Sequence, residues 1–186
     1  RALGELNSER EVPTRNLPKK RNRSRQKNEP TADIHSALFT LVGGVDLTQI
    51  HGLGPYSALR LVAECGTDMT RWPTVKHFTS WLTLAPGNKI SGGKVLSSRT
   101  RRSSNRATAL LRIVAVNVGR TSTALGAFYR RLAARIGKAK AVTATARKVA
   151  VLFYNTLRYG TAYKDPGADY YEERFRRRTI DNLRRR

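Results

Sequence analysis

A long stretch in the middle of the chain carries many basic residues and no acidic residue. Between Met69 and Lys164 there is no Asp or Glu, while 19 Lys or Arg residues lie between Arg71 and Lys164. The same stretch holds most of the apolar residues that recur at helical spacing, which indicates a folded region rather than a basic tail. A compact region of one charge sign repels itself unless a polyanion neutralises it. This feature predicts a mostly α-helical domain that binds nucleic acid.

The whole chain is similarly one-sided in charge. Its 186 residues contain 36 Lys and Arg against 13 Asp and Glu, a formal net charge of +23. An anionic membrane is the other polyanion to consider, but no segment of about 20 apolar residues could span a bilayer, so we expect no membrane partner. The lone Cys65 excludes an intramolecular disulfide, which suits a reducing cytoplasm and predicts a buried structural thiol.

Metal-dependent chemistry lacks its usual ligands in this chain. The central stretch has no carboxylates to hold Mg²⁺ in the manner of two-metal nucleases. The three His residues and the single Cys form no zinc pattern, so we predict no metal ligands and no cofactor here.

The chain divides into three regions. Residues 1–30 are polar and include six basic residues between Lys19 and Lys27, which predicts a flexible linker or, equally, an arm that binds the DNA backbone. Residues 31–165 form the predicted folded domain, and residues 166–186 form a basic C-terminal helix or tail. Because the chain starts at Arg1 and not at Met, we expect it to be a fragment or a processed product of a longer protein.

Apolar periodicity and capping residues predict the helices. We expect one after Thr74 that ends before Pro86, one from about Ala168, and others at residues 34–42, 47–50, 55–65, 105–118, 122–136 and 138–159. Residues 105–118 are apolar nearly all round, which predicts a buried helix. Residues 88–104 are rich in Gly, Ser and Arg and are expected to be irregular or extended.

The segment from Ile50 to Ala58 resembles the helix-hairpin-helix motif, which would occupy residues 46–66. Gly52 and Gly54 would let the backbone turn tightly and approach a phosphate. The helix that begins at Pro55 would present unpaired N–H groups and the positive end of its dipole. The alternative is a plain helical corner, which the charge of the chain disfavours.

Basic residues also surround a Ser-Gly-Gly sequence that begins at Ser91. By its residues alone, Ser91-Gly92-Gly93 is most simply a turn. The guanidinium fork of Arg matches phosphate oxygens, and no acidic residue offsets these charges. The candidate phosphate-binding side chains are Lys89, Lys94, Arg99, Arg101, Arg102, Arg106 and Arg112.

Other charged and aromatic side chains permit two interpretations. Trp72 and Trp81 are predicted to be core anchors rather than platforms for base stacking, whereas Tyr170 and Tyr171 fit either role. Five cations on the later helices fit a solvated face as well as contact with nucleic acid: Arg130, Arg131, Arg135, Arg147 and Lys148.

An ordered set of motifs along the chain resembles the C-terminal transposase domain of the DEDD-type insertion-sequence transposases. These are the insertion-sequence one-ten family with its one-sixteen and nine-o-two relatives. The resemblance begins near Asp33 and extends to the end of the chain, and no single motif in it is decisive. In order, the motifs are Gly52-Leu53-Gly54, Ala58, Ala63-Glu64, Gly66, Phe78, Trp81-Leu82, Pro86, Ser91-Gly92-Gly93-Lys94, Asn105-Arg106, Leu111-Arg112, Phe128-Tyr129, Lys140-Ala141, Ala146-Arg147-Lys148 and Tyr154.

The resemblance implies a DNA recombinase in which a serine attacks DNA and forms a covalent phosphoserine link. The family's proline-then-Ser-Gly pattern places that serine at Ser91, with Ser97 and Ser98 as weaker candidates that better suit turn or capping roles. Family members join this domain to an N-terminal RNase-H-like domain with four acidic residues, where Mg²⁺ is expected. The acidic domain lies outside this chain, so we expect the chain alone to be inactive.

The same resemblance implies partners and a location. These are DNA, a structured guide RNA that bridges target and donor DNA, and further copies of the protein in a homo-oligomer on DNA. A bacterial cytoplasmic protein associated with the nucleoid is the corresponding expectation.

Two other functions fit parts of the sequence. A non-catalytic RNA-binding protein of the ribosomal type can combine a helix-hairpin-helix with an Arg-rich tail, but such proteins are usually shorter. A DNA glycosylase would need a catalytic Asp soon after the hairpin. After Gly54 the next Asp is Asp68 and the one after that is Asp165, which disfavours the glycosylase.

Overall fold

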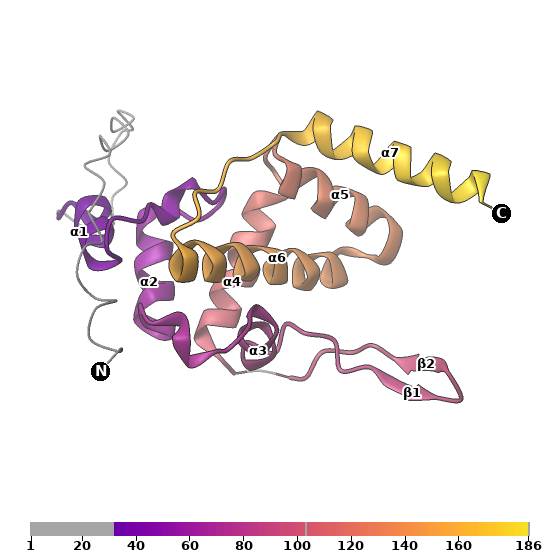
Figure 1. Ribbon diagram of the computed structural model, residues 1–186, viewed down its shortest axis with the longest axis horizontal. Helices are drawn as coiled ribbons and strands as arrows, with labels where there is room; N and C mark the ends of the chain where they lie inside the picture. Colours follow the sequence, from indigo (N-terminus) through magenta and orange to yellow (C-terminus); the bar gives the residue numbers. More distant parts are fainter. Residues whose placement is uncertain (1–31, 103, 186) are drawn as a thin grey trace, which may run out of the picture.

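The computed structural model describes residues 32–102 and 104–185, and these residues form a mostly α-helical fold, as the sequence predicts (Figure 1). The predicted arm at residues 1–30 lies outside the described residues. In chain order the elements are α1 (Ile34–Leu41), the 3-10 helix η1 (Leu47–Gln49), α2 (Pro55–Cys65), the 3-10 helix η2 (Met69–Arg71), α3 (Val75–Trp81), β1 (Lys89–Ser91), β2 (Lys94–Ser97), α4 (Arg106–Val118), α5 (Ala124–Ile136), α6 (Lys138–Tyr159) and α7 (Ala168–Arg184).

The longest helix, α6, lies in the middle of the helical body and packs against α3, α4 and α5. Its apolar face is buried as the spacing predicts, and the ring of Phe153 stacks on that of Phe78 with centroids 6.2 Å apart. The next residue, Tyr154, is also buried, and its hydroxyl donates a hydrogen bond of 2.8 Å to the carbonyl of Trp72. This aromatic cluster joins α6 to α3 and to the segment before it.

The helix ends follow the capping residues in the sequence. Asn105 accepts a hydrogen bond from the N–H of Thr108 at the start of α4, and Gly160 adopts the left-handed conformation that ends α6. Thr74 precedes α3 as predicted, but its side chain makes no capping bond to the backbone. Its hydroxyl is instead hydrogen-bonded to Nδ1 of His77 at 2.8 Å.

Helix α4 is less buried than its composition predicts. The side chains of Leu111, Val114 and Val118 are buried, but Ile113 is 58% exposed and Val116 is 38% exposed. The buried face packs against α2, α5 and α6, and the exposed pair lies on the face that no described element covers. An apolar sequence therefore indicates that a helix can be buried, while its neighbours decide which face is.

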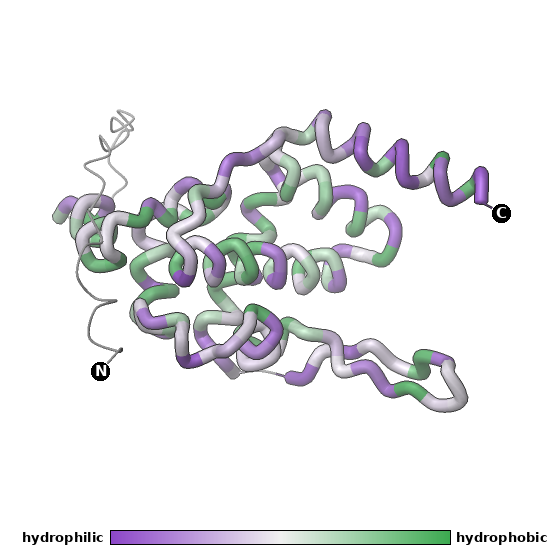
Figure 2. The backbone as a smooth tube through the Cα atoms, viewed as in Figure 1, coloured by the Kyte–Doolittle hydropathy of each residue, from purple (hydrophilic) through white to green (hydrophobic). Residues whose placement is uncertain are grey.

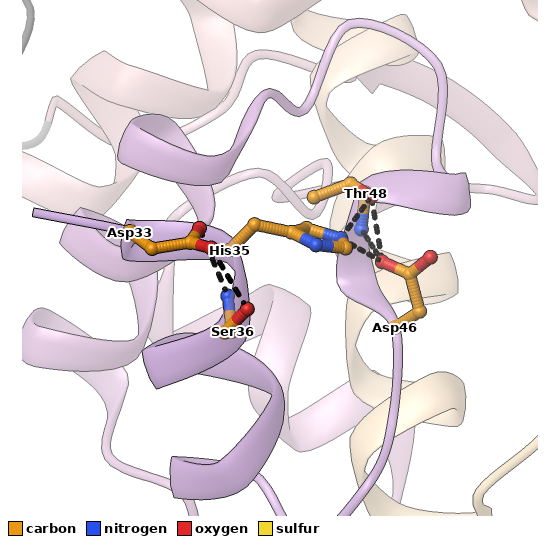
Figure 3. Close-up of polar contacts among 5 residues, drawn as sticks. All are labelled: Asp33, His35, Ser36, Asp46 and Thr48. Atoms are coloured by element: carbon orange, nitrogen blue, oxygen red, sulfur yellow. Dashed lines mark hydrogen bonds and ion pairs between the residues drawn. The ribbon is translucent and has the colours of Figure 1, made fainter. Parts of the chain in front are cut away.

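Helix α1 is tied to the segment around η1 by a small polar cluster (Figure 3). Asp46 accepts hydrogen bonds from the backbone N–H of Thr48 at 2.8 Å and from its hydroxyl at 2.6 Å, which confirms Asp46 as the capping residue of η1. Nε2 of His35 on α1 lies 3.2 Å from the Thr48 hydroxyl and 3.4 Å from the same carboxylate oxygen.

Helix α7 lies along α5 at the surface, and none of its residues is buried. Figure 2 shows it as the most continuously hydrophilic helix of the fold. The carboxylate of Asp165, just before α7, accepts hydrogen bonds from the N–H of Ala124 at 3.2 Å and from the Tyr163 hydroxyl at 2.8 Å. This carboxylate holds the C-terminal segment against the first turn of α5.

Candidate nucleic-acid interface

Ser91 lies at the turn of an antiparallel β-hairpin that extends away from the helical body (Figure 1). Ser91 pairs with Lys94, and the two residues between them, Gly92 and Gly93, have φ angles of 52° and 74°. Positive φ at both central residues is the geometry of a type I′ turn, which glycine adopts without a steric penalty. The sequence Ser-Gly-Gly-Lys is therefore a hairpin turn, and it leaves Ser91 exposed.

The hairpin is exposed from Lys89 to Leu96, and Ser97 at its end is half-buried. Lys89 and Lys94 are exposed near Ser91, and Leu96, Ile90 and Val95 are 70%, 63% and 58% exposed. An isolated two-stranded hairpin is marginally stable in water. These three apolar side chains lie among cations, and no described residue covers them. Such a surface suits contact with a partner that would stabilise the hairpin.

The predicted arginines follow the hairpin and continue onto α4. Arg99, Arg101 and Arg102 are exposed in the segment between β2 and α4, as candidates for phosphate contact should be. Arg106 begins α4, and its Nε lies 3.2 Å from Oε1 of Glu64 on α2. Glu64 therefore offsets one of these charges, which the spacing in the sequence did not indicate.

Arg112 differs from the other predicted cations because it is half-buried on α4. Its Nε is buried, and no hydrogen-bond partner for it exists among the described residues. Phosphate binding by Arg112 stays a prediction, with less of the side chain accessible than at Arg101 or Arg102.

The Gly52–Gly54 segment forms a tight turn between η1 and α2. A Cβ atom on Gly52, whose φ is 84°, would lie 2.4 Å from Cγ2 of Val118 on α4. Gly52 is therefore required by packing against α4, and its approach to a phosphate stays a prediction. Gly54 is open, because nothing lies within 4 Å of an added Cβ, and it precedes α2 without a capping side chain.

The N-terminal end of α2, which follows Gly54, has the geometry that anion binding needs. Pro55 has no N–H, so the first turn of α2 leaves the N–H groups of Tyr56 and Ser57 without intrahelical acceptors, next to the positive end of the helix dipole. The element before the turn is the short 3-10 helix η1 and not an α-helix. Phosphate binding at Gly54 stays a prediction.

Residues 46–130 match the family model described as Transposase IS116/IS110/IS902 family. This segment is a transposase domain of that family. It runs from the cap of η1 into α5, so it includes the glycine turn, the β-hairpin and all of α4. No curated protein and no solved structure matches the chain. Because transposases act on DNA, the match implies DNA as a partner.

The glycine turn and the arginines that follow the hairpin lie at opposite ends of α4. Gly52 packs on Val114 and Val118 at the C-terminal end of α4, whereas Arg102 and Arg106 lie at its N-terminal end. The 13 residues of α4 span about 20 Å at 1.5 Å per residue. A DNA that contacts both ends must therefore extend along α4 rather than enter a single point.

Two of the five cations on the later helices for which the sequence left two interpretations open make contacts within the chain. One guanidinium nitrogen of Arg130 donates hydrogen bonds to the carbonyls of Gly119 and Thr121, which satisfies the end of α4. Arg131 is paired with Glu172 and lies 3.6 Å from the ring centroid of Phe175 on α7. These two side chains hold helices together.

Lys148 is also engaged by neighbouring residues. Its Nζ lies 4.5 Å from the ring centroid of Phe128, and burial lowers its pKa, with the charges of Arg174 and Arg178 acting in the same direction. Arg135 is exposed and Arg147 is half-buried, so the two interpretations stay open for them.

Cys65 and Ser97 have the structural roles that the sequence predicts. Burial and the nearby charge of Glu64 raise the pKa of the Cys65 thiol to about 12, so it is not a nucleophile at neutral pH. The hydroxyl of Ser97 accepts a hydrogen bond from the N–H of Arg99. Ser98 is exposed next to it.

The predictions for the tryptophan side chains are confirmed for one residue and wrong for the other. Trp72 is 8% exposed and is a core anchor, but Trp81 is 42% exposed, contrary to the prediction. Tyr171 packs edge-on against Phe128, whereas Tyr170 is 56% exposed. In the described parts of the chain, no helix is long and apolar enough to cross a membrane.

Sequence reasoning also missed Thr83. It is the one non-glycine residue among those described with a positive φ, at 55°, and its hydroxyl oxygen is buried without a partner. No pattern in the sequence signals this residue, because only the path of the chain after α3 produces that conformation.

Proposed function

We propose that this transposase domain binds DNA and takes part in strand cleavage and joining during transposition, with Oγ of Ser91 as the nucleophile. The observation that carries the proposal is the position of Ser91, exposed at the turn of a basic hairpin within the segment that matches the transposase family. Backbone phosphates lie on the outer surface of duplex DNA, so an exposed hydroxyl at a protruding hairpin turn can approach one.

The reaction proposed is a transfer of the DNA strand to serine. Oγ of Ser91 attacks a backbone phosphorus, a phosphoserine bond forms, and the bond from phosphorus to the leaving deoxyribose oxygen breaks. The serine proton passes to a general base and the leaving oxygen takes up a proton. Attack by a deoxyribose hydroxyl on the phosphoserine reverses the step and joins the strand to a new partner.

The cations near Ser91 suit the electrostatic part of this reaction. Phosphoryl transfer depends on positioning and on stabilising the charge spread over phosphate oxygens. Lys89 and Lys94 flank Ser91, and Arg99, Arg101 and Arg102 follow in the same exposed segment. Lys89 and Lys94 would hold the reacting phosphate against the hydroxyl, and the arginines would hold other phosphates of the same DNA strand.

A serine hydroxyl also needs a general base, and no His, Asp or Glu lies close to Ser91 in the sequence. No described residue forms a hydrogen bond with its hydroxyl, and the stretch from Met69 to Lys164 has no carboxylate. We propose that the base comes from an acidic domain of the same protein or of another copy.

The partners beyond DNA are part of the same proposal. A structured guide RNA would select the sequences joined, because exposed Arg and Lys side chains that contact phosphates carry no sequence information themselves. Magnesium would bind at the acidic domain. In the described parts of this chain, no group of three or more His, Cys, Asp or Glu residues is placed to hold a metal ion.

Covalent trapping tests the nucleophile. The protein that contains this chain is incubated with its DNA and RNA, denatured, and analysed for a protein–DNA adduct that resists denaturant. We expect an adduct that disappears in Ser91→Ala and persists in Ser97→Ala, the matched control on the same hairpin. An adduct that survives Ser91→Ala would place the nucleophile elsewhere. Binding to DNA with no adduct under any condition would favour a non-catalytic binding role.

A further inference from the structure

A cavity of about 430 Å³ lies where α2, α3 and the start of α4 meet. It is separate from the β-hairpin and from the Gly52–Gly54 turn. Its volume is within the range of sites that bind small molecules. Its walls combine an aromatic ring, a hydroxyl, an amide and charged groups, supplied by Glu64, Trp81, Thr83, Arg102, Asn105 and Arg106.

The aromatic wall of the cavity is Trp81, the last residue of α3. Its ring is held by two others, with centroids 5.0 Å away for Trp72 and 6.1 Å away for Phe78, and the Phe78 ring is nearly parallel to it. Trp72 and Phe78 are both buried, while Trp81 is 42% exposed. An indole fixed by the core and open to the cavity is a ready platform on which a planar ring can stack.

Thr83 supplies a hydroxyl under unusual local conditions. After α3, the N–H of Leu84 bonds to the carbonyl of Thr79 and the N–H of Thr83 to that of Ser80, which is the Schellman arrangement. Thr83 occupies the left-handed position of that motif, at φ 55°, where glycine is the usual residue. A β-branched residue is strained there, and strain of this kind concentrates at ligand-binding sites.

The Thr83 hydroxyl is also unsatisfied. Its oxygen is buried and has no hydrogen-bond partner among the described residues. Glycine at this position would remove both the strain and the unpaired hydroxyl. A ligand in the cavity that Thr83 lines would reach this oxygen once the side chain turns toward it, and the bond would then satisfy the hydroxyl.

The opposite wall of the cavity is positively charged. Arg102 and Arg106 both line it, together with Glu64, whose Oε1 lies 3.2 Å from Nε of Arg106, so the two guanidinium groups outnumber the one carboxylate. Asn105 caps α4, whose first N–H groups and positive dipole end lie at the same place. Such a wall suits a phosphate group.

We propose that this cavity binds one unpaired nucleotide of a DNA strand, with its base stacked on Trp81 and hydrogen-bonded by Thr83 and its phosphate held by Arg102 and Arg106. The inference rests on the proposed function in taking DNA as the ligand, but it does not depend on Ser91. A base that leaves the helix during strand exchange needs a surface to replace its lost stacking.

Tryptophan fluorescence offers a direct test, because the chain has only two Trp residues. In Trp72→Phe, Trp81 is the sole reporter, and it lies at the cavity. The variant of the 186-residue chain is titrated with a short single-stranded oligonucleotide and with an abasic oligonucleotide of the same length and charge. Binding of each is followed separately by anisotropy of a dye on the DNA. We expect quenching of Trp81 by the base-bearing strand only, which should also bind on the order of tenfold more tightly.

Thr83→Val provides a second measurement that does not depend on Trp72→Phe folding. Valine keeps the shape and the strain of Thr83 but lacks the hydroxyl, so we expect a higher Tm for the free protein. The preference for the base-bearing strand over the abasic strand should fall about fivefold. A raised Tm with an unchanged preference would overturn the role of Thr83.

The outcomes separate this inference from the proposed function. Equal binding of the base-bearing and abasic strands without quenching would overturn the nucleotide cavity and leave backbone binding intact. No binding of either strand would contradict DNA binding itself, and the cavity proposal with it. Titration with deoxyadenosine monophosphate tests whether the ligand is a free nucleotide, which also has a base and a phosphate. Quenching by it at concentrations as low as those of the strand would assign the cavity to a free nucleotide and overturn the proposal.

Discussion

The helical body around α6 and the β-hairpin that carries Ser91 both combine apolar and basic residues. They differ in how many of these side chains are buried or bonded within the chain. Both lie in the stretch without acidic residues. In the body, side chains such as Phe153 and Val149 are fully buried, and even Arg130 is engaged by carbonyl groups of the same chain. In the hairpin, Ile90, Val95 and Leu96 are exposed.

The difference shows that residues of the same types have different roles in the two regions. In the body, the side chains contribute to folding, because apolar area is removed from water and polar groups are paired. In the hairpin, exposed apolar and basic side chains contribute little to folding, which leaves them available to a ligand. Substitutions should therefore affect stability in one region and binding in the other.

Truncation of an apolar side chain should separate the two regions most strongly. Phe153→Ala removes a buried ring from the aromatic cluster and should lower the free energy of unfolding by about 4 kcal/mol. Leu96→Ala removes an exposed side chain and should change it by less than about 0.5 kcal/mol. Urea denaturation followed by circular dichroism measures both. A comparable loss in the two variants would contradict the division.

A methyl group added to a glycine should make a similar distinction within the body. Gly52→Ala combines a positive φ with a collision against Val118, and should cost about 3 kcal/mol of unfolding free energy. Gly43→Ala is the matched control, since Gly43 has a φ of 72° with nothing within 4 Å of an added Cβ. Only the backbone penalty, about 1 kcal/mol, should remain there. Equal Tm shifts would mean that contact with α4 is not what requires Gly52.

Neutralising one cation at a time should show which region each cation serves. Arg101→Gln should weaken duplex binding and reduce the salt slope by about one, with an unchanged Tm. Arg130→Gln removes the hydrogen bonds at the end of α4 and should lower the free energy of unfolding by about 1.5 kcal/mol. Anisotropy titrations at several salt concentrations, with parallel thermal melts, test both. A salt slope that Arg101→Gln leaves unchanged would remove Arg101 from the interface.

Alkaline pH should lower the free energy of unfolding, because the thiol of Cys65 is buried in the helical body. Burial raises the pKa of its thiol from its ordinary value of 9.0 to about 12, so the folded state holds a proton that the unfolded state loses in this range. The stability that the protonated thiol contributes is fully present below about pH 9 and is lost as the pH rises toward 12. The resulting decrease in the free energy of unfolding is about 1 kcal/mol at about pH 10. Burial also raises the pKa of Tyr163 and Tyr154, which adds to the same trend.

The variant Cys65→Ala should flatten part of this decline in urea midpoints measured between neutral and alkaline pH. The two tyrosines should account for the rest of the decline in stability. A pH dependence identical to that of the original chain would show that the thiol does not contribute.

Much of the local structure was predictable from neighbouring residues. The bounds of α2 follow from Pro55 and Gly66, and those of α4 from the cap at Asn105, because these residues act on the turn next to them. Asp46 and the Ser91–Lys94 turn belong to the same class. The candidate nucleophile and the exposed arginines were also named from the sequence, with a known family as a guide.

Residues whose role depends on a distant partner were not predictable in the same way. The contact of Gly52 with Val118 joins residues far apart in the chain, and so does the bond from Asp165 to the first turn of α5. Trp81 and Trp72 follow similar apolar patterns, but only the packing of α3 on α6 leaves one of them at a cavity.

The sequence by itself determined the charge of the molecule, its helices and their caps, and the hairpin turn at Ser91, because each depends on composition or on contacts within a few residues. The tertiary structure alone decided which face of α4 is covered, which arginines are engaged within the chain, and where Trp81, Thr83 and Arg106 meet. Those outcomes depend on how separate helices pack, and packing is a property of the whole set of contacts rather than of any one segment.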